Sequence, residues 1–288
     1  MVARGERIHV IGIGGSGAAG AAVLLDHAGA VVDGCDADAP SPYTPALDAA
    51  GIAWFDGHDP AHLADVNRVA VTPALRAVPQ HAERDAAGAA GLPVVTWQAL
   101  LGELMAEPGR LGLAVTGTHG KSTTTALLGH LLVAAGMDPT VEVGAFIGDW
   151  GASVRPGGGA PFVVEADEAR LLARLADWDG RIIRYGPGGD VAATSVEFGR
   201  DGTSFDLFDR RFEMRLAGAH NVLNATAALA LARELSADLD ALREGLRTFA
   251  GAGRRMELIA DTARVTIFDD YAHHPTEVRA ALAAARQM

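Results

Sequence analysis

The sequence contains one lysine and one cysteine among its 288 residues, and it has no long hydrophobic run. The single cysteine, Cys35, excludes an intrachain disulfide and favours a reducing compartment. No apolar run approaches the ~18 residues that a membrane-spanning helix requires, which argues against a membrane partner. Residues 1–7 lead into an apolar strand without the apolar core of a signal peptide, so we expect a cytoplasmic protein.

Basic side chains are scarce as well. The 24 lysine and arginine residues are outnumbered by 36 acidic ones, which gives a formal net charge of -12. This balance argues against nucleic acid as a partner, because proteins that bind a nucleic-acid backbone usually present a basic face. The negative net charge does not exclude a nucleotide ligand, because loops and helix ends bind nucleotides locally. With 49% hydrophobic and 21% charged residues, the composition is that of a globular protein of about two domains.

The one lysine is Lys121, and every other basic side chain is arginine. A compact ammonium fits into a phosphate-binding loop where the flat, forked guanidinium of arginine does not. We therefore expect a specific role for Lys121, with drift in an arginine-rich genome as the alternative.

Strand and helix patterns alternate along the N-terminal part of the chain, as in a parallel sheet wrapped by helices. Predicted strands cover 8–13, 30–35, 69–72 and 94–95, and predicted helices cover 18–27, 82–90 and 97–105. The segment 107–109 (Glu-Pro-Gly) predicts a domain boundary, after which a second α/β unit begins. Its predicted strands are 111–115, 161–164, the hairpin strands 195–208 and 211–216, and 265–268; its predicted helices are 122–135, 221–235, 239–249 and 275–286.

A glycine-rich turn lies between the first predicted strand and the first predicted helix. Its pattern, Gly12-x-Gly14-x-x-Gly17, suits a diphosphate held by backbone amides and the helix dipole. Asp36 closes the next strand, near the place where an acidic residue would bind a ribose hydroxyl. The pattern alone leaves open NAD, FAD or another nucleotide diphosphate, as well as a purely structural tight turn.

A second glycine-rich loop contains the lysine and follows the strand predicted at 111–115. It reads GTHGKST from Gly117 to Thr123, with two residues between its glycines instead of the four of the general phosphate loop. We expect its amides to face the β- and γ-phosphates of ATP and Lys121 to neutralise their charge. Ser122 or Thr123 would reach Mg²⁺.

Acidic residues follow the buried-strand pattern at 162–164. Glu165 ends this strand, and Asp167 and Glu168 stand beside it. Such a strand end is often solvated surface, but next to a phosphate loop we expect Glu165 to bind the metal ion.

Two later motifs admit more than one interpretation. Asn221 precedes a predicted helix, and an ordinary N-cap explains it as well as a ligand role does. His273 and His274 are adjacent, which is a weak pattern for zinc because neighbouring side chains diverge on most backbones. We expect the segment 269–275 to be a hinge that makes polar contacts to a nucleotide.

Taken in order, six motifs resemble those of the Mur ligases over almost the whole chain. They are GIGGSG, TGTHGKSTTT, EADE, GAHNVLNATAA, GAGRRME and DDYAHHPTEV. The resemblance implies an α/β fold, with an N-terminal Rossmann-like parallel sheet domain at 1–107 and a P-loop ATPase-type central domain at 108–270. Residues 271–288 would be the remnant of a C-terminal ligase domain that is largely missing.

The resemblance also implies the residues of the site. Those expected to hold a UDP-sugar are Gly14, Gly15, Ser16, Gly17, Asp36 and His58. Those expected to bind ATP are Gly117, Thr118, His119, Gly120, Lys121, Ser122, Thr123, Asn221, Asn224, Arg254 and Asp270. Those expected to hold Mg²⁺ are Ser122, Thr123 and Glu165, and the expected catalytic residues are Lys121, Glu165 and His274.

Within the family, the THGK loop and the DDYAHHPTE string indicate the branch that joins L-alanine to UDP-N-acetylmuramic acid in peptidoglycan synthesis. ATP would phosphorylate the muramyl carboxylate, and the amine of alanine would attack the resulting acyl phosphate. The branch that recycles murein tripeptide shares most of these motifs and stays open.

The sequence departs from the family pattern at two places. The stretch after EADE that normally contains an Asp-His pair is absent, which shortens the central domain and removes a ligand of a second metal ion. The chain then ends just inside the expected third domain. We therefore keep open a non-catalytic nucleotide-binding protein, a subunit completed by another chain and a homo-oligomer, with an NAD-dependent oxidoreductase as the most distant alternative.

Overall fold

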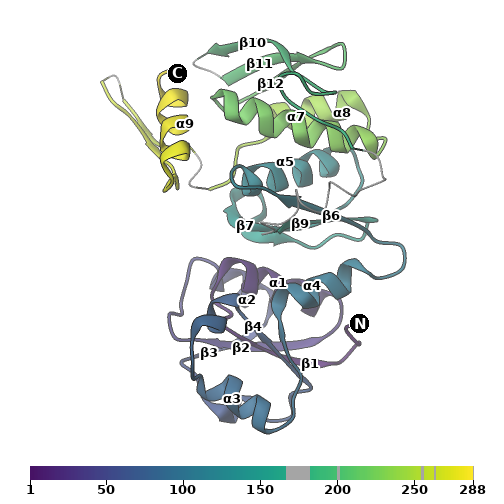
Figure 1. The fold of residues 1–288 in the computed structure, drawn as a ribbon, viewed down its shortest axis with the longest axis vertical. Coiled ribbons are helices and arrows are strands. Elements are labelled where there is room, and N and C mark those ends of the chain that lie inside the picture. The colour runs from purple at the N-terminus through teal and green to yellow at the C-terminus, as the bar shows by residue number, and fades with distance from the viewer. Residues whose placement is uncertain (167–181, 200–201, 254–255, 263, 288) are drawn as a thin grey trace. The chain divides into compact units, whose positions relative to one another are not determined.

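The computed structural model describes residues 1–166, 182–199, 202–253, 256–262 and 264–287 (Figure 1). It divides into two compact units. The first unit comprises Met1–Gly112 and Thr140–Phe162, and the second comprises Leu113–Pro139 and Val163–Met288. None of the helices formed by the described residues is both long and apolar enough to cross a membrane. The predicted division at residues 107 and 270 stays a prediction.

The first unit is built on a five-stranded parallel sheet with the strand order β3-β2-β1-β4-β5. Its strands are β1 (Arg7–Ile11), β2 (Val31–Asp36), β3 (Ala53–Asp56), β4 (Arg68–Val71) and β5 (Val94–Thr96). Its helices are α1 (Ser16–His27), α2 (Thr44–Ala50), α3 (Ala82–Ala89) and α4 (Trp97–Met105), with short 3-10 helices at Pro60–Leu63 and Pro73–Ala77. Strands β1 and β4 are almost wholly buried, as expected for the apolar central strands of a parallel sheet.

Gly34 lets β2 pack closely against β1 and the side chain of Ile13. It pairs with Val10 in the parallel register of β1 and β2. A β-carbon at Gly34 would lie 2.4 Å from the Val10 carbonyl oxygen and 2.6 Å from Ile13 Cδ1. Since the nearest atom belongs to the backbone of the neighbouring strand, it cannot move aside like the end of a flexible side chain.

The first unit also contains an antiparallel pair of strands, β7 (Thr140–Ile147) and β8 (Ala152–Arg155), joined through a 3-10 turn at Gly148–Trp150. The Ser153 hydroxyl in β8 donates a hydrogen bond of 2.9 Å to the Ser16 carbonyl at the start of α1. This contact helps to hold the beginning of α1 in place.

In the described part of the second unit, helices α5 (Lys121–Ala134), α7 (Ala219–Glu234) and α8 (Leu239–Thr248) pack together beside small sheets (Figure 1). Helix α9 (Pro275–Ala285) follows near the C-terminus. The strands β10 (Thr194–Gly199), β11 (Gly202–Leu207) and β12 (Arg210–Met214) form an antiparallel sheet, and β13 (Glu257–Asp261) pairs with β14 (Thr266–Asp269). Strands β6 (Leu111–Thr116) and β9 (Pro161–Ala166) are neighbours and lead into the second unit.

We expect Gly34→Ala to lower the free energy of unfolding by about 1–3 kcal/mol, because the added methyl group overpacks the contact with Val10. Urea unfolding followed by circular dichroism measures the change. Gly102→Ala is the matched control, since a β-carbon at Gly102 in α4 meets no atom within 4 Å. The control should be neutral or slightly stabilising, because alanine is the better helix former. Equal stability of the two variants would contradict the packing argument.

Candidate functional site

The lysine-containing loop joins β6 to α5 in the second unit. Gly120 has a φ of 78° and occupies the N-cap position of α5, where it offers no capping side chain. The amides of the first turn of α5 therefore remain directed at the loop, which is the arrangement that binds anions at helix N-termini. Among the described residues, the buried hydroxyl of Thr116 at the end of β6 has no hydrogen-bond partner. An orphaned hydroxyl beside such a loop fits a bound polar ligand.

The predicted lysine, serine and glutamate lie at this loop. Lys121 Nζ donates a hydrogen bond of 3.1 Å to the Gly117 carbonyl, so the lysine folds back over the loop. Ser122 Oγ donates to Glu165 Oε1 over 3.1 Å, which places the end of β9 at the start of α5. A hydroxyl and a carboxylate that meet in this way offer the oxygen ligands that Mg²⁺ prefers. The neighbours Asp167 and Glu168 lie outside the described residues.

A cavity of about 320 Å³ adjoins the loop within the second unit. This volume is in the range of small-molecule binding sites. The predicted ATP-binding residues that line it are His119, Gly120, Thr123, Asn221, Asn224 and Asp270. Gly117, Thr118, Lys121 and Ser122 belong to the same loop and helix start but are not among the lining residues, and Arg254 lies outside the described residues.

Two asparagines of α7 form one wall of the cavity. Asn221 Nδ2 donates to the Ala217 carbonyl over 2.8 Å, and Asn224 Nδ2 donates to Asn221 Oδ1 over 3.2 Å. Interpreting Asn221 as an ordinary N-cap is wrong, because Gly218 occupies that position and α7 begins at Ala219. These hydrogen bonds within the first turns of α7 hold both asparagine side chains in place. Asn224 Oδ1 is thereby directed at the loop beside Gly120.

Glu277 in the first turn of α9 connects this helix to the phosphate loop. Its Oε1 lies 2.9 Å from His119 Nδ1, while its Oε2 accepts hydrogen bonds from the amides of His273 and His274. Burial alone would raise the pKa of Glu277, but the hydrogen bonds from His119 and these two amides outweigh it and hold the pKa below its usual value. Glu277 was missed by the sequence analysis, although it stands three residues after His274 at the spacing of a capping box.

His274 itself is the N-cap residue of α9, and its ring lies 5.2 Å from the ring of His119 between centroids. It does not line the cavity. Asp270 does, but Oδ2 accepts a hydrogen bond from the Met256 amide and Oδ1 accepts one from the Ala272 amide. His220 also lines the cavity, and burial lowers its pKa against the opposing effect of Asp270. We therefore expect a neutral His220 ring in this wall.

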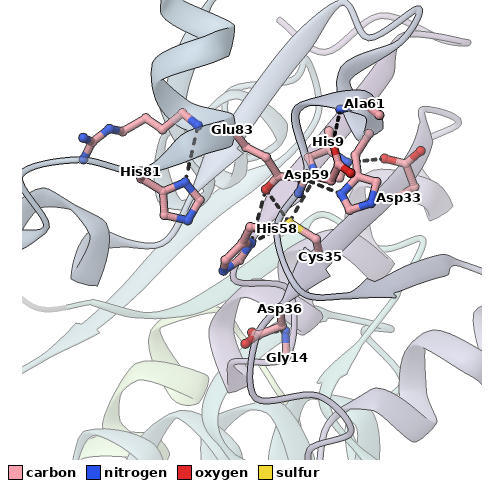
Figure 2. Close-up of polar contacts among 12 residues, drawn as sticks. His9, Gly14, Asp33, Cys35, Asp36, His58, Asp59, Ala61, His81 and Glu83 are labelled. Carbon is pink, nitrogen blue, oxygen red and sulfur yellow. Dashed lines mark hydrogen bonds and ion pairs between the residues drawn. The ribbon is translucent and has the colours of Figure 1, made fainter.

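The other predicted nucleotide site is the glycine-rich turn at the start of α1 in the first unit. Asp36 Oδ2 accepts a hydrogen bond of 2.9 Å from the Gly14 amide (Figure 2). The Ser41 hydroxyl donates to the Gly14 carbonyl over 2.6 Å. Gly15 is the N-cap residue of α1 and carries no side-chain cap. The acidic residue thus braces the turn, while the amides that begin α1 after Gly15 lack a side-chain cap and could bind an anion.

His58, the last of the predicted substrate contacts, lies in a cluster that sequence reasoning did not find. Its Nδ1 is 3.2 Å from Glu83 Oε2 and 3.1 Å from Cys35 Sγ (Figure 2). The His58 side chain is 25% exposed, whereas the Glu83 side chain is fully buried. These residues come from separate elements of the first unit, and their spacing along the sequence carries no signal that they meet.

Three family models match the chain in succession. The model described as "Mur ligase family, catalytic domain" matches residues 7–108, and the "Mur ligase middle domain" matches residues 152–232. The "Mur ligase, glutamate ligase domain" matches residues 254–288. The matches include the glycine-rich turn of the first unit and most of the residues that line the cavity, while the lysine loop lies between the matched segments.

Curated relatives match almost the whole chain. A UDP-N-acetylmuramate--L-alanine ligase of Acidothermus cellulolyticus is 36% identical over 345 residues, which covers 97% of this chain and 71% of the relative. One of Kineococcus radiotolerans is 38% identical over 353 residues and covers 99% and 74%. Both alignments are longer than this chain of 288 residues, so the relatives contain internal residues without a counterpart here.

The fold is similar to that of two solved ligases. The UDP-N-acetylmuramate-alanine ligase of Thermotoga maritima superposes with a TM-score of 0.82 at 24% identity and covers 98% of this chain and 77% of that one. The murein peptide ligase of Psychrobacter arcticus gives 0.75 at 25% identity, with coverages of 98% and 76%. With the parallel sheet, the lysine loop beside Glu165 and relatives above 30% identity over nearly its full length, this chain belongs to the Mur ligase family.

Proposed function

We propose that this chain is an ATP-dependent ligase that joins L-alanine to UDP-N-acetylmuramic acid in peptidoglycan synthesis, by way of an acyl phosphate. The observation that carries the proposal is the meeting of Ser122 and Glu165 at 3.1 Å beside Lys121, next to a cavity of about 320 Å³. The relatives named as ligases of this substrate pair support the choice of substrates. The predicted cytoplasmic location stays a prediction.

The second unit fits ATP and Mg²⁺. The loop amides and Lys121 would hold the β- and γ-phosphates, and the cavity between α5, α7 and α9 would take the nucleoside beside Asn221, Asn224 and Asp270. Ser122 and Glu165 would hold Mg²⁺, because their oxygen atoms already converge. Thr123 is a second candidate for the metal, being buried in the same helix turn.

In the proposed reaction, bound ATP supplies the phosphoryl group that activates the muramyl carboxylate. Lys121 stabilises the charge that develops on the transferring group, and the fixed amides of α5 add to this stabilisation without rearranging. His119 would be kept in place beside these phosphates by its contact with Glu277. His274, 5.2 Å from His119 between ring centroids, would lie near the transferring group.

The UDP-sugar is the ligand that we propose for the first unit, in place of NAD or FAD. The start of α1 after Gly15 would face the diphosphate, with Ser16 and Gly17 in the first turn. Asp36 and His58 would lie near the uridine end. Because Asp36 already accepts the Gly14 amide, its first contribution is to fix the shape of the turn.

The direct test is phosphate release with UDP-N-acetylmuramic acid, MgATP and L-alanine. We expect release that depends on alanine. If release depends on murein tripeptide instead, the chain catalyses the recycling reaction. If ATP binds but no amine causes release, the chain is a non-catalytic nucleotide-binding protein. If release appears only after another chain is added, the prediction of a complementing partner holds. A homo-oligomer stays a prediction.

Lys121→Ala is expected to reduce alanine-dependent phosphate release at least about 100-fold, because the charge on the transferring phosphate loses its stabilising cation. Lys121→Arg should be impaired as well, since the forked guanidinium does not fit a loop built for an ammonium. Arg247→Ala is the control, an exposed cation of α8 that pairs with Glu244. Full activity in Lys121→Ala would refute the assignment of this loop to ATP.

Glu165→Gln is expected to raise the Mg²⁺ concentration required for half-maximal phosphate release by roughly tenfold or more, because a charged oxygen ligand becomes a neutral one. The measurement is a magnesium titration at saturating ATP. Glu213→Gln, at an exposed position of β12, provides a charge-matched control. If the magnesium titrations of wild type and Glu165→Gln superimpose, Glu165 is not a ligand of the metal ion.

A further inference from the structure

Four potential metal ligands converge in the first unit. They are His9 on β1, Cys35 on β2, His62 in the 3-10 helix Pro60–Leu63 and Glu83 on α3. One ligand atom of each lies within 4.8 Å of the others, and Figure 2 shows His9, Cys35 and Glu83 turned toward one another. His9, Cys35 and Glu83 are buried, and the His62 side chain at the rim is 17% exposed. The proposed ligase reaction uses none of the four.

The distances between these atoms are close to those of a metal site. Glu83 Oε1 lies 2.6 Å from His62 Nδ1 and 3.5 Å from His9 Nε2, while Glu83 Oε2 lies 2.7 Å from Cys35 Sγ. Cys35 Sγ lies 3.4 Å from His9 Nε2. Ligand atoms around tetrahedral zinc stand about 3.3–3.8 Å apart, given bonds of ~2.0–2.3 Å. The shorter contacts are hydrogen bonds, which lengthen when an ion replaces the shared proton.

Surrounding groups orient the ligands as they do around bound zinc. His9 Nδ1 lies 2.7 Å from Asp33 Oδ1, so an Nδ1 proton donated to this carboxylate leaves Nε2 directed at Cys35 and Glu83. Zinc-bound histidines typically donate their other ring nitrogen to a carboxylate in this manner. On the other side, the Asp59 amide donates to Glu83 Oε1 over 3.2 Å.

Metal binding to this cluster would be coupled to proton release. Burial would raise the pKa of Glu83, but hydrogen bonds from His9, Cys35 and His62 lower it to about 2, so this buried group is a carboxylate. Burial lowers the pKa of His9, but Asp33 and Glu83 raise it to about 9. Burial raises the pKa of the Cys35 thiol. A metal ion that binds here releases protons from Cys35 and His9 and takes over their role as partners of Glu83.

We propose that His9, Cys35, His62 and Glu83 form a tetrahedral zinc site that ties α3 and the 3-10 helix Pro60–Leu63 to strands β1 and β2. The mixture of imidazole, thiolate and carboxylate ligands selects zinc over magnesium or calcium, which prefer oxygen alone. Because four protein ligands fill the coordination sphere of a tetrahedral zinc ion, no position is left for a substrate, and the site would have a structural role. His58 Nδ1 lies within hydrogen-bond distance of both Glu83 and Cys35 at the edge of the site, so the metal would help to fix the position of a residue that we place near the UDP-sugar.

Cobalt titration of the full, untagged, metal-free chain tests this site without using its activity. Co²⁺ in a tetrahedral thiolate site gives intense visible bands and a near-ultraviolet band from sulfur-to-cobalt charge transfer. We expect both bands to saturate at one ion per chain and to vanish when Zn²⁺ is added. Cys35→Ser should abolish the charge-transfer band, while His27→Gln, at an exposed histidine of α1, should leave the spectrum unchanged.

A second variant tests the orientation of His9 and does not touch the metal. Asp33→Ala should weaken zinc binding about 10- to 100-fold, as loss of a carboxylate behind a zinc-bound histidine typically does. The readout is competition with a chromophoric chelator. His62→Gln, at the rim, should weaken it further while circular dichroism stays unchanged. Absence of the thiolate band in the wild-type chain, or a band that persists in Cys35→Ser, would overturn the proposal and leave a hydrogen-bonded cluster without metal.

Discussion

Gly120 lies so close to Asn224 that a β-carbon would stand 2.4 Å from the Asn224 Oδ1. Glycine is favoured here because the φ of 78° is rarely adopted by other residues and because a side chain would displace the Asn224 amide. The approach of loop to helix brings the start of α5 against the first turns of α7. Lys121, Ser122 and Glu165 lie at the same end of α5, and the cavity adjoins its loop, so this close approach contributes to the geometry of the proposed ATP site.

Local features of the second unit could be predicted from the sequence. The strand β6, the loop and α5 follow from an apolar run, two glycines and a run of helix formers, and Glu165 follows from its place at the end of a buried strand. The long-range contacts could not be predicted. Glu277 is 158 residues from His119, and only the folded chain brings them together. Short or polar elements such as β3, α2 and β13 lack the periodic apolar pattern that would have revealed them.

The first unit shows the same limit at its proposed substrate and zinc sites. The glycine-rich turn and Asp36 were predicted from spacing, and the structure joins them by the hydrogen bond from the Gly14 amide. The cluster around Glu83 had no such signal, because His9, Cys35, His62 and Glu83 are spread along the sequence over four elements. Alternation of strands and helices predicts that their ends meet at a sheet edge, but not which side chains face one another.

Glu277 uses its two oxygens for two different tasks, one for His119 in the phosphate loop and the other for the amides that begin α9. The shared carboxylate therefore connects two segments that are far apart in the sequence. A phosphate bound at the loop would compete with Glu277 for His119. Glu277 would then lose a hydrogen-bond partner for its carboxylate, which lies at the positive end of the α9 dipole. Occupancy of the loop would thereby be coupled to the position of α9 through this one carboxylate.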